Sequence, residues 1–78
     1  MYTLEEYRDL VKKAYVKHFT ERQMTNAMKY FDSDEAQKEI REQYNSDIKK
    51  LKSGEITDNV FRHGSVSGTA YTLYLMQD

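Results

Sequence analysis

With 78 residues, the chain can enclose one small hydrophobic core, so we expect a single domain over residues 1–78. Twelve basic and thirteen acidic residues give a net charge of −1, which disfavours both a basic nucleic-acid binder and an acidic DNA mimic. The sequence contains no cysteine, which excludes disulfides, thiolate metal sites and a cysteine nucleophile. Because no long apolar run is present, we expect no membrane association and a cytoplasmic location.

The first predicted helix begins with a capping box. Thr3 and Glu6 have the spacing at which a hydroxyl and a carboxylate accept hydrogen bonds from the free backbone N–H groups of a helix start. A stripe then recurs every three or four positions until His18, where we expect the helix to end. This stripe consists of Leu4, Tyr7, Leu10, Val11, Ala14 and His18.

Two more helices are predicted before residue 53. Thr20 and Gln23 repeat the capping-box spacing, so a second helix should begin at Glu21. The run DSDE, residues 32–35, supplies short oxygen-bearing side chains ahead of a third helix, which a cluster of lysines and Ser53-Gly54 should end. The expected buried residues are Met24, Ala27, Met28 and Phe31 on the second helix and Ala36, Ile40, Tyr44, Ile48 and Leu51 on the third.

The segment after the third helix gives a weaker signal. All three glycines lie at or after residue 54, which sets this part of the chain apart from the helix-rich body. Ile56, Val60 and Phe61 predict only a short helix, which a turn at His63-Gly64 should end.

Residues 65–77 fit both a strand and a helix. Their threonine, tyrosine and valine content is typical of a strand, which would pair with residues 55–62 in a hairpin. A helix would instead start at Ser65 or Ser67. Its buried face would consist of Val66, Ala70, Leu73 and Tyr74.

We favour the helix because a two-stranded hairpin leaves unpaired strand edges. The predicted fold is therefore all-α, a compact bundle of three main helices plus a short helix and a C-terminal helix. The alternative is an α+β fold with a C-terminal β-hairpin.

The end of the chain resembles a known group of sequences. The stretch NVFRHGSVSGTAYTLYLM, residues 59–76, is similar to a recurring C-terminal pattern in small uncharacterised proteins of bacterial phages and mobile elements. The resemblance implies an accessory protein and not a metabolic enzyme, and such accessory proteins include inhibitors of host defence such as anti-CRISPR proteins. It assigns no chemistry to any residue.

No catalytic or metal-binding arrangement is recognised in the sequence. His63 has no His, Asp or Glu three or four residues away, and His18 is expected beside the C-terminal dipole of the first helix. The run DSDE at residues 32–35 resembles the start of a calcium loop, but Gln37 and Gln43 stand where an EF-hand needs glycine and glutamate. We therefore expect no enzyme activity, no cofactor and no metal.

Tyrosine is the residue in excess. Seven tyrosines are more than a small core can enclose with every hydroxyl hydrogen-bonded, so some should lie at the surface. Tyr15, Tyr30 and Tyr71 fall beside the apolar stripes and are candidates for a contact patch with Phe61 and Met76. The residues that we expect to bind a protein partner are Phe61, Tyr71, Tyr74 and Met76.

These patterns favour a non-enzymatic protein–protein interaction module. Together with the resemblance, they predict a phage or mobile-element accessory protein or inhibitor of the anti-defence type, which acts by steric occupation of a partner. A homodimer is another way for so small a core to cover its remaining apolar surface. A small DNA-associated regulator is the alternative, although Asp34, Glu35 and Glu39 at the start of the third helix would repel phosphate.

Overall fold

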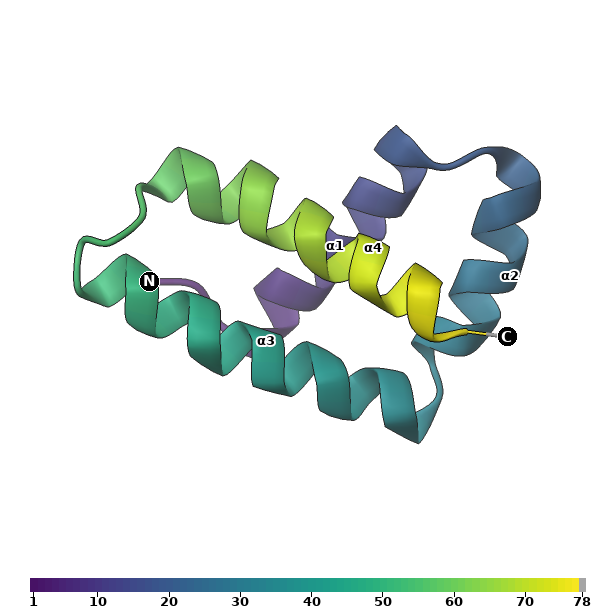
Figure 1. Ribbon diagram of the computed structural model, residues 1–78, viewed down its shortest axis with the longest axis horizontal. Helices are drawn as coiled ribbons and strands as arrows, with labels where there is room; N and C mark the ends of the chain where they lie inside the picture. Colours follow the sequence, from purple (N-terminus) through teal and green to yellow (C-terminus); the bar gives the residue numbers. More distant parts are fainter. Residues whose placement is uncertain (78) are drawn as a thin grey trace.

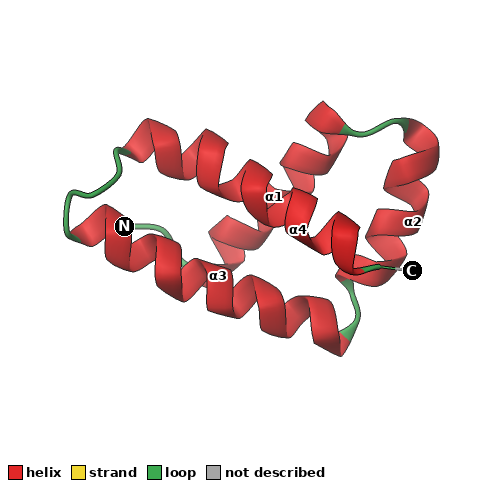
Figure 2. Cartoon of the chain, in the orientation of Figure 1, coloured by secondary structure: helices red, strands yellow, loops and turns green. Residues whose placement is uncertain are grey.

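The computed structural model describes residues 1–77, and the regular structure among them is helical throughout (Figure 1, Figure 2). The elements are α1 (Leu4–His18), α2 (Glu21–Phe31), α3 (Asp34–Lys52), the π-helical segment η1 (Val60–Ser65) and α4 (Val66–Met76). Over this part of the chain no strand is formed, so the predicted all-α fold is confirmed and the alternative hairpin is wrong.

The helices enclose one core between them. Figure 1 shows α3 and the continuous η1–α4 helix running in opposite directions, with α1 crossing behind them and α2 closing one end. Each predicted stripe contributes residues to this core. His18, at the end of the first stripe, is the one predicted stripe residue that is exposed. The fully or nearly fully buried apolar residues are Tyr7, Val11, Ala14, Tyr15, Ala27, Phe31, Ala36, Ile40, Ile48, Phe61, Val66, Ala70 and Leu73.

The starts of the first three helices are fixed by the predicted caps. The Thr3 hydroxyl accepts from the Glu6 N–H at 3.1 Å, and the Glu6 carboxylate accepts from the Thr3 N–H at 2.8 Å. Thr20 and Gln23 form the same reciprocal pair at the start of α2. The Ser33 hydroxyl caps α3. Both capping boxes and the start of the third helix are therefore confirmed.

The last helix begins earlier than predicted and continues through the expected break. The Thr57 hydroxyl accepts from the Val60 N–H at 3.2 Å, and helical backbone then runs from residue 58 to Met76. The predicted turn at His63-Gly64 is wrong, because both residues lie inside η1. The predicted cap at Ser65 or Ser67 is also wrong, since Ser65 has helical φ and ψ angles and no capping hydrogen bond, and Ser67 lies inside α4.

The π-helical segment places two core side chains on one face. Phe61 and Val66 are five residues apart, and in an α-helix of 3.6 residues per turn their side chains would point about 140° away from each other. A π turn joins residues i and i+5 by hydrogen bonds and so takes more residues per turn. Both side chains are consequently buried, Phe61 completely and Val66 to 2% exposure.

Gly68 lies on the solvent face of α4, and alanine at this position should stabilise the protein. A Cβ added there meets no atom within 4 Å. Because glycine inside a helix is destabilising relative to alanine, we expect Gly68→Ala to raise the free energy of unfolding by about 0.5–1 kcal/mol in a urea titration. Gly54→Ala is the matched control, since Gly54 follows α3 with φ of +81° and should lose about 1 kcal/mol. A destabilised Gly68→Ala protein would contradict this placement.

Candidate functional site

Aromatic residues predicted at the surface lie partly in the core. Phe61 is completely buried, with its ring stacked on Tyr2 at a centroid distance of 4.8 Å, so a partner cannot touch it in this fold. Tyr15 is also completely buried, and Tyr30 is half-buried against the core. The contact patch predicted for Tyr15, Tyr30 and Tyr71 with Phe61 and Met76 is therefore not formed as a whole, because Tyr15 and Phe61 are buried.

The other predicted contact residues lie near the end of α4. Tyr71 is 57% exposed. Tyr74 is half-buried, because its ring stacks on Phe19 at 4.9 Å and its hydroxyl accepts a hydrogen bond from the Gln23 amide at 3.2 Å. Met76 is half-buried and packs against the core. Of the four predicted residues, Tyr71 is thus the one that presents most of its side chain to solvent.

A buried hydrogen-bonded trio joins α1, α3 and α4, and two of its members were missed in the sequence. The Tyr7 hydroxyl donates to Asp47 at 2.7 Å and lies 2.6 Å from the Thr69 hydroxyl. Burial raises the pKa of the Tyr7 hydroxyl far above its ordinary value, so this oxygen keeps the proton that it donates. With that proton committed to Asp47, Thr69 is the donor to Tyr7. These hydrogen bonds hold α1, α3 and α4 together in the interior.

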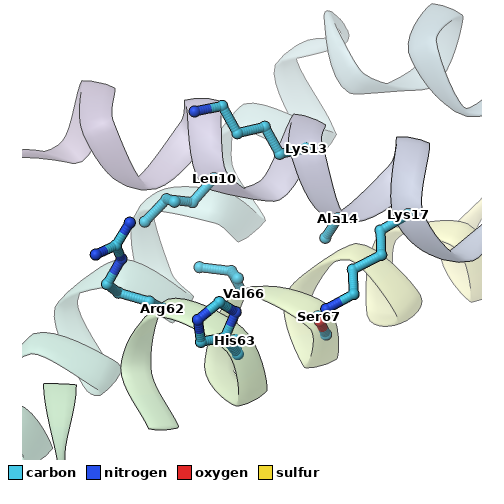
Figure 3. Close-up of a pocket in the computed structure, with 8 residues that line it drawn as sticks. All are labelled: Leu10, Lys13, Ala14, Lys17, Arg62, His63, Val66 and Ser67. Atoms are coloured by element: carbon cyan, nitrogen blue, oxygen red, sulfur yellow. The ribbon is translucent and has the colours of Figure 1, made fainter. Parts of the chain in front are cut away.

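A groove lies between α1 and the η1–α4 helix, and its central hollow has a volume of about 200 Å³ (Figure 3). Apolar side chains form its floor and basic side chains its rim. The lining residues are Leu10, Lys13, Ala14, Lys17, Arg62, His63, Val66 and Ser67. In Figure 3, Lys17 points from α1 toward the η1–α4 side, and the Arg62 guanidinium is turned toward Leu10. The helix that carries the π turn therefore supplies half of the rim.

The basic side chains of the central hollow have no ion-pair partner among the described residues. Within residues 1–77, Lys13, Lys17, Arg62 and His63 form no ion pair and no hydrogen bond. All four are exposed. Since the whole chain carries a net charge of −1, Lys13, Lys17 and Arg62 make this part of the surface a local positive patch on a protein that is slightly acidic overall.

A second hollow, of about 320 Å³, continues the groove along α4 and is mostly apolar. Its lining residues are His18, Phe19, Ser67, Ala70 and Tyr71. Ser67 belongs to both hollows, and its hydroxyl lies 3.1 Å from the His18 Nε2 atom, so this hydrogen bond bridges α1 and α4 where the hollows meet. We call this second space the apolar hollow.

A third hollow, of about 210 Å³, extends the groove in the other direction. It shares Leu10, Lys13 and Arg62 with the central hollow and adds Tyr2, Glu6 and Asp9. The groove thus passes from mixed charge, through a basic centre, to an apolar end beside Tyr71. A groove with this order of surfaces is suited to binding a segment of another molecule that lies along its whole length.

Two further searches of the described residues bear on the chemistry of the chain. Residues 1–77 contain no group of three or more histidine and carboxylate side chains placed to hold a metal ion. None of the helices described over the same range has both the length and the apolar character needed to cross a bilayer.

No protein-family model, curated protein or solved structure matches the chain. The geometry of the groove is therefore what bears on its role. The resemblance of residues 59–76 to proteins of phages and mobile elements remains a prediction.

Proposed function

We propose that the chain is a non-enzymatic protein-binding module that presents the apolar hollow and the neighbouring solvent face of α4 to a protein partner. The observation that carries this proposal is the exposure of two large apolar side chains one helical turn apart. Tyr71 is 57% exposed and Leu75 is 64% exposed. Side chains four residues apart lie on the same face of a helix, so the two form one continuous surface.

The residues around Tyr71 and Leu75 support the interpretation of this pair as a binding surface. Scattered apolar residues are normal on protein surfaces, whereas an apolar pair beside an apolar hollow offers both a contact surface and a recess. Tyr71 lines the apolar hollow, which is large enough to receive a side chain from a partner. Tyrosine is enriched at binding hot spots because it combines a large rigid ring with a polar tip.

Tyr71 and Leu75 are also dispensable for the core. The opposite face of α4 already buries Val66, Ala70 and Leu73. Substitution of the exposed pair should therefore change binding without unfolding the protein, which makes the proposal testable by mutation.

Steric occupation is the mode of action that this surface supports. A module that covers a partner's surface needs no reacting group, only a stable exposed patch. The resemblance of residues 59–76 supports a setting in phages or mobile elements, where such a module would act as an accessory protein or an inhibitor of host defence. A host protein is the partner that this setting implies.

The test is a double substitution, Tyr71→Ala with Leu75→Ala. A binding peptide is first selected against the wild-type protein from a displayed library of random peptides, and its affinity is measured by fluorescence anisotropy. We expect the double variant to bind this peptide at least about tenfold more weakly, because truncation of a hot-spot residue costs more than about 1 kcal/mol.

Val16→Ala is the matched control for this test. Val16 is 64% exposed, as Leu75 is, but it lies on α1 and, unlike Tyr71, lines none of the three hollows. Its substitution should leave peptide affinity unchanged. A double variant that stays folded and keeps its full affinity would contradict the proposed function.

A further inference from the structure

The groove also indicates what kind of segment it receives. We propose that the occupant is an acidic, amphipathic helix of a protein partner, with its carboxylates over the central hollow and an apolar side chain in the apolar hollow. This inference rests on the proposed function and specifies the chemistry of the partner.

Charge complementarity is the first argument. Lys17, Arg62 and Lys13 are basic side chains, and none of them forms an ion pair within the described part of the chain, although Glu6 and Asp9 line the adjoining third hollow beside Lys13 and Arg62. They surround a floor formed by apolar side chains such as Val66. Walls of low dielectric strengthen the field of charges placed beside them, so carboxylates of a partner gain more here than on an open surface.

The order of side chains along the last helix is the second argument. Ser67, Tyr71 and Leu75 follow one another at intervals of four residues in α4 and therefore form one row on its surface, and His63 precedes them in η1. At a rise of 1.5 Å per residue, the eight steps from Ser67 to Leu75 span roughly 12 Å, or about two turns of a partner helix. From Arg62 and His63 to this row the surface passes from basic to apolar, so its partner should pass from acidic to apolar.

A nucleic acid fits this groove less well than an acidic helix. A phosphate backbone carries its charges at regular short intervals, and a strand that continued past Arg62 would meet Glu6 and Asp9 in the third hollow. At the other end it would leave the basic residues for the apolar hollow beside Tyr71. The positive patch is therefore shorter than the run of phosphates that it would have to neutralise.

The test combines peptide selection with charge reversal. Peptides selected against the wild-type protein should carry Asp or Glu about one helical turn or more from a leucine or aromatic residue. The best of them, made synthetically, should bind Lys17→Glu with Arg62→Glu at least about tenfold more weakly than the wild type, and its affinity for the wild type should fall as salt is raised. Lys17→Gln with Arg62→Gln should give a smaller loss in the same direction.

Lys29→Glu with Lys50→Glu is the matched control. Both lysines are exposed, lie outside the three hollows, and undergo the same change of net charge. This variant should bind the peptide with the same affinity as the wild type. The result would distinguish the effect of the basic side chains in the groove from the effect of the net charge of the protein.

Several results would overturn the inference. Selected peptides without acidic residues, or acidic peptides that bind the charge-reversed protein equally well, would overturn it. If such peptides still required Tyr71 and Leu75, the proposed function would stand. Binding of a single-stranded oligonucleotide that competes with the selected peptide and is abolished by the same charge reversal would favour a nucleic acid instead. A solution mass that shows a dimer, abolished by the same charge reversal, would favour a second copy of the chain.

Discussion

Phe61→Ala is expected to lower the free energy of unfolding by about 3–5 kcal/mol. The Phe61 ring is completely buried, stacks on Tyr2 at 4.8 Å and lies 5.5 Å from the ring of Tyr7. Its removal would leave a cavity where η1 meets the start of α1. A chain of 78 residues has a total stability of about 4–12 kcal/mol, so the loss is a large share of it. Urea unfolding followed by circular dichroism measures the effect.

Tyr71→Ala on the same helix is the control for this prediction. Because Tyr71 is 57% exposed, its truncation should change stability by no more than about 0.5 kcal/mol. The comparison also helps to interpret binding experiments. A Phe61 variant would lose affinity for a partner because the protein unfolds, and not because a contact with the partner is removed. A Phe61→Ala protein as stable as the wild type would show that the ring does not pack as described.

Tyr7→Phe is expected to lower the free energy of unfolding by about 1–3 kcal/mol. The substitution keeps the ring but removes the hydroxyl that bonds to Asp47 and Thr69. Asp47 is only 8% exposed, so its carboxylate would lose a donor in a place that water reaches poorly. Thermal and urea unfolding of the purified variant measure the loss.

Tyr15→Phe supplies a control of the same chemistry on the same helix. Tyr15 is as completely buried as Tyr7, but its hydroxyl has no hydrogen-bond partner among residues 1–77. Burial, and to a lesser extent the neighbouring Tyr30, raises the pKa of this hydroxyl to about 12. Its removal should leave stability unchanged or raise it slightly. Equal losses in the two variants would contradict the role given to the trio.

Much of the fold could be predicted because its signals are local. Thr3 with Glu6 and Thr20 with Gln23 define helix starts within four residues, and the structure contains both capping boxes. The apolar stripes likewise follow the α-helical period and are buried as expected. These features depend on neighbours in the sequence and not on contacts between distant helices.

The π turn is not predicted by the local signals, because the glycine after His63 indicates a turn. Phe61 and Val66 are also five residues apart and fall on different faces at 3.6 residues per turn, so the α-helical period does not join them into one helix. A spacing of five between two strongly apolar residues, in a run without proline, is the signal that could have indicated a continuous helix with a π turn.

The candidate site was predicted only in part. The excess of tyrosine correctly indicated that at least one lies at the surface, but tertiary packing decides which one, and Tyr71 is exposed while Tyr7 and Tyr15 are buried. Asp47 lies three residues after Tyr44 on the buried stripe of α3, so its spacing could have marked it as an internal partner for a tyrosine hydroxyl. The groove gives no such signal, because its two walls are distant in the sequence.

The groove lies between the two helices that the Tyr7–Thr69 contact also holds together across 62 positions of the chain. An occupant that touches both walls can bind only while α1 and the last helix remain docked, which is the folded state. Binding and global folding are then thermodynamically linked, and each increment of affinity becomes an increment of resistance to unfolding. For a domain this small, a bound partner would therefore also protect the chain against proteolysis of its transiently opened form.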